Sequence, residues 1–191
     1  MMQHVFFTTE QTPVTTALIS LDQPWQDARS LTLPAELAPW ILEPASLTAR
    51  LKRHCRHFRL QLLNERQSAL PPFLQPLLPG TANAQLREVM LWCDDKPCVY
   101  AQSWLPQQTI NRLQPLADMG ERPLGDYIFQ QPGLSRGTIE ATELQLHGVL
   151  TRGTEAGHCF ARRSVFQLHG LPLLVAEVFL PAIRRLEPVT A

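Results

Sequence analysis

Two pairs of apolar segments, each pair joined by a short polar turn, constrain the fold of this chain most. Residues 86–93 and 98–105 flank the turn Asp94-Asp95-Lys96-Pro97, and residues 160–168 and 173–180 flank the turn 169–172. Apolar runs of strand length on both sides of a polar turn are typical of a β-hairpin. We therefore expect an antiparallel sheet that contains these two hairpins.

Further elements are expected around the hairpins. Helical patterns cover residues 34–42, residues 47–55 behind Ser46 as N-cap, residues 109–118, and residues 123–129 with Pro123 in the first turn. Alternation of apolar and polar residues predicts strands at 58–62 and 138–146 and a short one at 15–20. Strands in hairpins mixed with separate helices indicate the α+β class, a single antiparallel sheet flanked by helices.

Length and composition restrict the function. The 191 residues fit one domain, and we expect an irregular N-terminal segment at 1–33 followed by the domain at 34–191. Seventeen basic and seventeen acidic residues balance, which argues against nucleic-acid binding.

No apolar run approaches the roughly 20 residues of a membrane helix, and no signal-peptide pattern opens the chain. We expect a cytoplasmic protein whose cysteines, at 55, 93, 98 and 159, are free thiols rather than disulfides or metal ligands.

Glu177 is the one polar residue in the apolar stretch 171–182. A nearly unbroken apolar strand is usually buried on both faces. Burial of a carboxylate is costly unless a cation or hydrogen bonds compensate, and it raises the pKa of the group toward values suited to proton chemistry. An edge-strand glutamate that faces water, or a structural ion pair, is an equally weighted alternative.

Two further features could bind a carboxylate. Arg87 shares a strand face with Val89 and Leu91, while Glu88 faces the other way, and an arginine among apolar side chains can bind a carboxylate through two hydrogen bonds. The alternative is a strand-end arginine that reaches solvent. The expected helix start at Pro123-Leu124-Gly125 offers free backbone N–H groups, although most helix N-termini bind only water or a cap.

Other chemistry is poorly supported. Arg162-Arg163 could be an anion site, although a surface-facing pair at a strand start is the more frequent case. The histidines form no ligand set, and neither a glycine-rich phosphate loop nor a G-x-S-x-G motif is present. We therefore expect no metal and no cofactor, and either cofactor-free chemistry or simple binding.

Several short segments occur in a fixed order: residues 86–89, the hairpin through Pro106, residues 123–129, Ile139-Glu140, residues 162–164 and residues 172–181. In this order they resemble the bacterial chorismate pyruvate-lyases that open ubiquinone biosynthesis. The resemblance covers roughly residues 34–182 and is strongest from Leu86 onward.

The resemblance implies a fold, a reaction and a site. The family's fold is an antiparallel sheet flanked by helices, with the ligand enclosed under helical flaps. The family eliminates pyruvate from chorismate to give 4-hydroxybenzoate without a cofactor, and the resemblance implies a monomer. It implies that Arg87 binds the ring carboxylate together with backbone amides at Leu124 and Leu47, and that Glu177 meets the ring hydroxyl.

One position departs from the family pattern. Relatives often carry arginine where this chain has Gln102, and glutamine cannot supply a charge to the carboxylate of the leaving group. Either another cation, Arg136 or Arg163, binds the carboxylate of the leaving group, or the activity is altered.

The second hypothesis is therefore a non-catalytic domain that binds a small aromatic carboxylate, as the same fold does in some transcription regulators. Those proteins carry a winged helix-turn-helix, for which the segment before Leu86 is too short and not basic enough. The lyase is favoured because Arg87 and Glu177 are both present.

Overall fold

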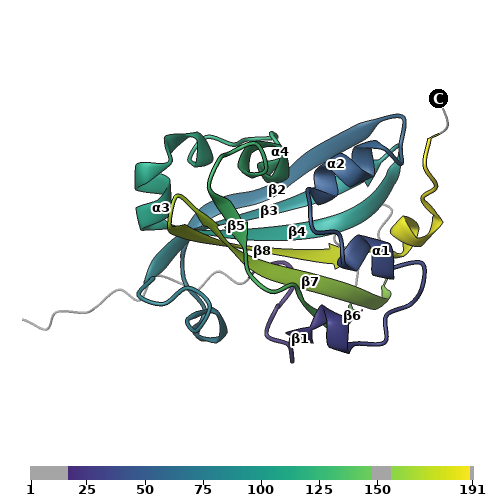
Figure 1. Cartoon of the computed structure of the whole chain (residues 1–191), viewed down its shortest axis with the longest axis horizontal. Helices are drawn as coiled ribbons and strands as arrows, with labels where there is room; N and C mark the ends of the chain where they lie inside the picture. The colour runs from purple at the N-terminus through teal and green to yellow at the C-terminus, as the bar shows by residue number, and fades with distance from the viewer. Residues whose placement is uncertain (1–16, 148–155, 190–191) are drawn as a thin grey trace, which may run out of the picture.

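The protein is described by a computed structural model that covers residues 17–147 and 156–189. Within these residues, eight strands form one sheet in the order β1-β6-β7-β8-β4-β3-β2, with β5 paired to β7, and every pairing is antiparallel. Short helices lie over one face of this curved sheet (Figure 1). The α+β fold with a single antiparallel sheet is therefore confirmed.

The strands are much longer than the helices. The strands are β1 Gln26–Asp27, β2 Phe58–Ala69, β3 Asn83–Cys93, β4 Lys96–Pro106, β5 Leu134–Arg136, β6 Glu140–Leu146, β7 Gly157–Leu168 and β8 Leu171–Phe179. The α-helices are α1 Ala38–Ile41, α2 Leu47–Lys52, α3 Gln107–Arg112 and α4 Leu124–Ile128, and 3-10 turns lie at Ala28–Ser30, Pro72–Leu74, Gln114–Leu116 and Pro181–Arg185.

Both predicted hairpins are present. In the β7–β8 hairpin Leu168 pairs with Leu171, and both residues of the intervening turn, His169 and Gly170, have positive φ angles of 52° and 76°. Two consecutive positive φ angles define the type I′ turn, whose twist matches that of the flanking strands. The β3–β4 hairpin turns after Cys93, at Asp94, whose φ is 53°.

Several predicted boundaries differ from the structure. The helix expected at 34–42 is helical only over α1, and the helix expected at 109–118 stops at Arg112, three residues before Pro115, and continues as a 3-10 turn. The predicted N-cap of α2 is confirmed, because Ser46 Oγ accepts a hydrogen bond from Ala49 N at 3.2 Å, but the helix ends at Lys52. The strand expected at 58–62 continues to Ala69.

The N-terminal region is described only from residue 17. Residues 15 and 16 of the strand predicted at 15–20 lie outside the described residues, and residues 17–20 form no strand. Ile19 and Leu21 are buried in an apolar cluster that also contains Met90, Tyr100 and Val178. The described part of this segment therefore packs against the face of the sheet opposite α2.

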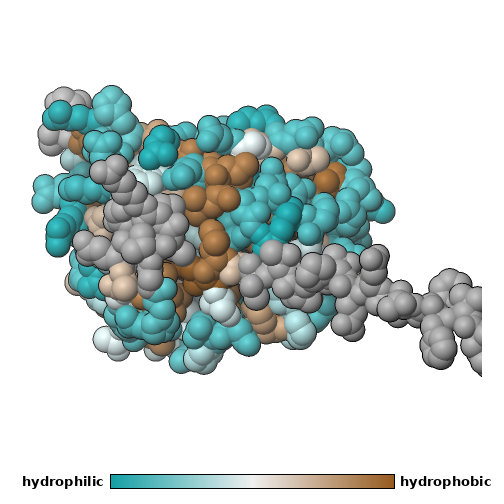
Figure 2. Space-filling view, turned by 180° about the vertical axis from the view of Figure 1, so that it is seen from behind, coloured by the Kyte–Doolittle hydropathy of each residue, from teal (hydrophilic) through white to brown (hydrophobic). Residues whose placement is uncertain are grey.

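Three further properties concern the surface, the cysteines and the length and hydrophobicity of the helices. Seen from behind, the surface is largely hydrophilic with one hydrophobic strip (Figure 2). All four cysteines are buried, and none of them forms a disulfide. Across residues 17–147 and 156–189, no helix has the length and hydrophobicity needed to cross a membrane.

Candidate active site

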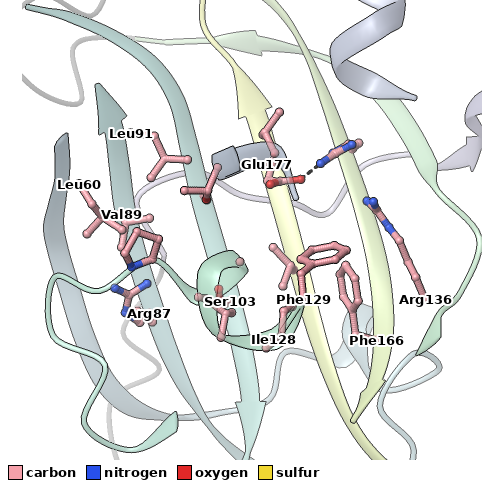
Figure 3. A pocket seen from close by; sticks show the side chains of 18 residues that line it. Leu60, Arg87, Val89, Leu91, Ser103, Ile128, Phe129, Arg136, Phe166 and Glu177 are labelled. Carbon is pink, nitrogen blue, oxygen red and sulfur yellow. Dashed lines mark hydrogen bonds and ion pairs between the residues drawn. The ribbon is translucent and has the colours of Figure 1, made fainter. Parts of the chain in front are cut away.

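A pocket lies between the sheet and the helices α2 and α4 (Figure 3). Most of its lining residues are apolar, and its charged side chains are Arg87, Arg136, Arg162 and Glu177. The sheet supplies Leu60, Arg87, Val89, Leu91, Ala101, Ser103, Arg136, Arg162, Phe166, Val175 and Glu177, and the helices with their flanks supply Leu47, Thr48, Pro123, Leu124, Gly125, Ile128 and Phe129. An apolar pocket with a few convergent polar groups is the usual form of a small-molecule site.

The first turns of α2 and α4 meet over this pocket. A Cβ added to Gly125 would lie 3.0 Å from Ser46 Oγ and 3.2 Å from Thr48 Oγ1, so glycine is what allows the two helices to approach so closely. Lys52 and Asp126 join the same helices by an ion pair of 2.5 Å. Leu47 and Leu124, the first residues of the two helices, consequently both line the pocket.

Arg87 forms one end of the pocket and is only 1% exposed. Its Nη2 donates hydrogen bonds to the carbonyl oxygens of Gly120 at 2.6 Å and Arg122 at 3.1 Å. Its Nε lies 3.5 Å from Glu65 Oε1 without a hydrogen bond, and Nη1 has no partner among the described residues. Burial lowers the pKa of Arg87, and the charge of Glu65 opposes this shift. Arg87 is thus a buried cation with unused donors.

Glu177 forms the other end of the pocket. It lies opposite Arg162 in the β7–β8 register, and Arg162 Nε donates to Glu177 Oε2 at 2.6 Å. Nη1 of Arg162 donates to the carbonyl oxygens of Trp40, Ile41 and Glu43, which fixes the arginine in place. Oε1 of Glu177 accepts no hydrogen bond from the described residues. The structural ion pair considered from the sequence therefore exists, and one carboxylate oxygen still faces the pocket.

Arg136, the last residue of β5, supplies a further positive charge. Its Nε donates to Ser164 Oγ at 2.9 Å, its Nη1 donates to Glu43 O at 2.9 Å, and its guanidinium carbon lies 5.0 Å from the centre of the Phe166 ring. Burial, and then the charge of Arg162, lower the pKa of Arg136 to about 10. No carboxylate within the described part of the chain forms an ion pair with Arg136.

The four residues predicted for the site lie around one pocket. Arg87, Glu177, Leu47 and Leu124 all line it, although the roles predicted for them stay predictions. Sequence reasoning missed the pairing of Arg162 with Glu177, and it considered Arg162-Arg163 as an anion site or, more often in such sequences, a surface-facing pair. Two aromatic walls, Phe129 and Phe166, were also missed, because neither has a motif of its own.

The interpretation of Gln102 as a pocket residue was wrong. In the β3–β4 hairpin Cys93 pairs with Lys96, and an uninterrupted register would place Gln102 opposite Arg87. A bulge between Leu91 and Trp92 shifts the register by one residue, so that Ser103 lies opposite Arg87. Since a one-residue shift reverses the face of every side chain, Gln102 points to the back of the sheet.

The other candidate cation, Arg163, also faces away from the pocket. Its Nε donates to Glu140 Oε2 at 2.7 Å, and its guanidinium carbon lies 4.6 Å from the centre of the Trp25 ring. Of the two cations considered in place of residue 102, Arg136 alone lines the pocket. Among the residues that the structure describes, no cluster of histidine, cysteine or acidic side chains has the geometry of a metal site.

Comparisons with known proteins agree on one family. The family model for chorismate lyase matches residues 20–187. A protein of Pseudoalteromonas translucida named "Probable chorismate pyruvate-lyase" is 41% identical over 170 residues, which cover 85% of this chain and 94% of that protein. The "Chorismate pyruvate-lyase" of Hamiltonella defensa is 34% identical over 162 residues, which cover 83% of this chain and 85% of that protein.

Solved structures share the fold at low sequence identity. The ligand-binding domain of a GntR-family transcriptional regulator from Bordetella bronchiseptica has a TM-score of 0.51 at 15% identity, and the match covers 71% of this chain and 88% of that domain. A gene product of Staphylococcus aureus has a TM-score of 0.52 at 16% identity, with 73% of this chain and 89% of that protein covered. At such identities the likeness concerns the fold alone.

Proposed function

This chain belongs to the chorismate lyase family, and on that premise we propose that it eliminates pyruvate from chorismate and leaves 4-hydroxybenzoate in the pocket under α2 and α4. The observation that carries the proposal is the placement of Arg87 and Glu177 at opposite ends of one apolar pocket. A benzoate with a hydroxyl group in the para position has its anionic and its neutral polar group at opposite ends of an apolar ring. The pocket has the same order of polar and apolar groups.

The strand register supports this fit. Arg87 on β3 lies opposite Ser103, and Glu177 on β8 lies opposite Ala101, so the two charged residues flank β4. Strand spacing and rise place their Cα atoms roughly 10 Å apart across the sheet and about 7 Å apart along it. The small side chains of Ala101 and Ser103 leave the space between them for one ring.

Each end of the substrate has a defined partner. The ring carboxylate binds the unused Nη1 of Arg87, and the backbone N–H groups of Leu124 and Leu47 complete its hydrogen bonds. The 4-hydroxyl donates to Oε1 of Glu177, while Arg162 holds the other oxygen of that carboxylate in position. Phe129, Phe166 and Val89 enclose the ring and exclude water.

The reaction needs little beyond this arrangement. The bond between ring carbon C3 and the ether oxygen breaks, the proton on C4 leaves, and its electron pair forms the new ring double bond. Aromatisation supplies the driving force, so the protein mainly has to hold the side arm in a reactive pose. We take the proton to pass to the methylene carbon of the enolpyruvyl group, which yields pyruvate without a separate base. Glu177 then orients the hydroxyl and polarises C4. No electrons are exchanged with an outside group, so the reaction requires no cofactor.

We further propose that the protein works as a monomer in the cytoplasm. Its free thiols suit a reducing compartment. Because α2 and α4 cover the pocket, they are the flaps that must open for substrate to enter and for product to leave.

The test is incubation of the purified protein with chorismate, with 4-hydroxybenzoate followed by chromatography and pyruvate by a coupled dehydrogenase assay. We expect both products in equal amounts, and we expect Glu177→Gln and Glu177→Ala to abolish turnover. Glu140→Gln is the matched control, because Glu140 also pairs with an arginine of β7 but does not line the pocket.

The alternative function has its own signature. If 4-hydroxybenzoate binds but neither product appears above the spontaneous rate, the protein is a non-catalytic domain that binds a small aromatic carboxylate. Thermal unfolding of each Glu177 variant, with and without 4-hydroxybenzoate, separates loss of chemistry from loss of folding.

A further inference from the structure

The charges that line the pocket do not balance. Three arginines line it, Arg87, Arg136 and Arg162, and Glu177 is the one carboxylate among the lining residues. Glu177 neutralises Arg162, and Glu65 lies 3.5 Å from Arg87, but no carboxylate of residues 17–147 and 156–189 pairs with Arg136. Arg136 is half-buried. A cation that is partly withdrawn from water without a counter-ion is destabilised, and an anion supplied by a ligand removes that cost.

Arg136 is held in place with one donor group unused. Ser164 Oγ accepts from its Nε, and the carbonyl oxygens of Glu43 and Pro44 accept from its Nη1 at 2.9 Å and 3.4 Å. Its Nη2 has no partner among the described residues. In Figure 3 the guanidinium of Arg136 points toward the end of the pocket that Glu177 occupies. A rigid arginine with a free amino group inside a pocket is suited to bind a carboxylate.

We propose that Arg136 is a substrate-binding residue that holds the carboxylate of the enolpyruvyl side arm of chorismate. This inference rests on the proposed lyase function and extends it to the second anionic group of the substrate. The side arm is attached to C3, next to the 4-hydroxyl that meets Glu177. A carboxylate on that arm therefore arrives on the side of Glu177 where Arg136 lies. Arg162 is a poorer candidate, because its charge is already neutralised by the carboxylate of Glu177, to which its Nε donates at 2.6 Å.

The two arginines match the two negative charges of the substrate. Chorismate is a dianion, and the pocket offers one arginine to each of its carboxylates. Arg87 binds the carboxylate on the ring, and Arg136 binds the carboxylate on the side arm. As the bond from C3 to the ether oxygen breaks, negative charge develops on the departing enolpyruvate oxygen, close to the guanidinium of Arg136. Preorganised donors aimed at a developing charge favour bond cleavage. Afterwards 4-hydroxybenzoate and pyruvate each carry one carboxylate.

A binding experiment tests the proposal directly. The probes are 4-hydroxybenzoate and 3-(carboxymethoxy)-4-hydroxybenzoate, a stable compound that carries a second carboxylate on an oxygen at C3. By calorimetry, Arg136→Gln should bind the dicarboxylate about 10- to 100-fold more weakly than the unaltered protein does. Its affinity for 4-hydroxybenzoate should stay within about 3-fold, since that probe lacks the second carboxylate. Arg163→Gln, an arginine of β7 that faces away from the pocket, should bind both probes normally.

Turnover provides a second measurement. Arg136→Gln should lower kcat/KM for chorismate about 100-fold or more, because both binding and leaving-group stabilisation are lost. Arg136→Lys should recover part of the affinity for the dicarboxylate, because it keeps the charge but loses the planar fork.

Three outcomes would overturn the assignment. Equal losses for both probes in Arg136→Gln would mean that Arg136 only holds residues 43–44 in place. Unchanged affinity for the dicarboxylate would mean that another group binds the second carboxylate, as would unchanged turnover of chorismate. Failure of the lyase function looks different: the unaltered protein would bind both probes but would form no pyruvate from chorismate. A loss of affinity for the dicarboxylate alone in Arg136→Gln would then still identify a dianion site.

Discussion

Arg87 and Glu88 are neighbours on β3, both are buried, and they point to opposite faces of the sheet, yet their surroundings differ. Glu88 is 0% exposed and accepts hydrogen bonds from the backbone N–H of Leu18 at 2.7 Å, from Asn64 Nδ2 at 2.9 Å and from the hydroxyl of Tyr100, with Arg66 3.5 Å away. Arg87 is 1% exposed and keeps Nε and Nη1 free of hydrogen bonds to the described residues.

The difference separates a structural charge from a functional one. A buried charge whose hydrogen-bonding capacity is filled by its own chain stabilises one arrangement of that chain, here the attachment of residues 18–19 to the back of the sheet. Gln102 belongs to the same network, since its Nε2 donates to Ile19 O at 2.5 Å and to Tyr100 Oη at 2.8 Å. A buried charge with unused donors beside a pocket has capacity left for a ligand.

The largest expected effect is on catalysis, from Arg87→Met. Removal of the arginine that binds the ring carboxylate should lower kcat/KM for chorismate by roughly 1,000-fold, about 4 kcal/mol. The free energy of unfolding should fall by only about 1 to 2 kcal/mol, because the carbonyl oxygens of Gly120 and Arg122 lose their donor while a poorly compensated buried charge is removed. Steady-state kinetics and urea unfolding give the two values. If Arg87→Met lost much of its stability but kept its turnover, Arg87 would be a structural charge and not a functional one.

Glu88→Ala should show the opposite pattern. Its loss leaves the Tyr100 hydroxyl, the Asn64 amide and the Leu18 N–H without their acceptor, so the free energy of unfolding should fall by about 3 to 5 kcal/mol. The affinity of the folded fraction for 4-hydroxybenzoate should not change, because Glu88 does not line the pocket. Urea unfolding and calorimetry at low temperature check both statements. A Glu88→Ala protein of unaltered stability would show that the filled network contributes nothing to the fold.

Gln102 tests the same contrast at a single position. Gln102→Leu should lower the free energy of unfolding by about 1 to 2 kcal/mol, because the carbonyl of Ile19 and the hydroxyl of Tyr100 lose a buried partner. Turnover of chorismate should be unaffected. Gln102→Arg, which restores the residue that relatives often carry, should not raise turnover, since position 102 faces away from the pocket. A clear gain in kcat from Gln102→Arg would contradict the register that places Ser103 opposite Arg87.

The sequence predicted the local features of this molecule better than the distant ones. The hairpins and the Ser46 cap depend on neighbouring residues, and the unusual positions of Arg87 and Glu177 in apolar strands identified both ends of the pocket. The face of Gln102 depends on one bulge between Leu91 and Trp92, for which no local signal was recognised. The four predicted helices are present, but each is shorter than predicted. Fewer than about 12 residues form a stable helix only through tertiary packing, so the local pattern does not determine where such helices end.

Glu43 gives the smallest expected effect and sharpens the comparison, because it lies on the pocket side of the sheet but has its hydrogen-bonding capacity filled by its own chain. Its Oε1 accepts from Ala45 N and its Oε2 from Arg50 Nη1, both at 2.9 Å. Burial alone would raise the pKa of Glu43, but the hydrogen bonds from Arg50 and Ala45 outweigh it and the pKa lies below its ordinary value of 4.5.

A lowered pKa in the folded state means that the ionised form stabilises the fold. The contribution of Glu43 is therefore fully present above the unfolded pKa of 4.5 and is lost as the pH falls through the lower folded value. Glu43→Gln should be less stable than the unaltered protein at pH 7 by up to about 1 kcal/mol, with the difference shrinking below pH 4.5. Urea unfolding at several pH values measures this difference. A difference that persists at low pH would show that Glu43 acts through the position of its backbone carbonyl, which both Arg136 and Arg162 share, rather than through its charge.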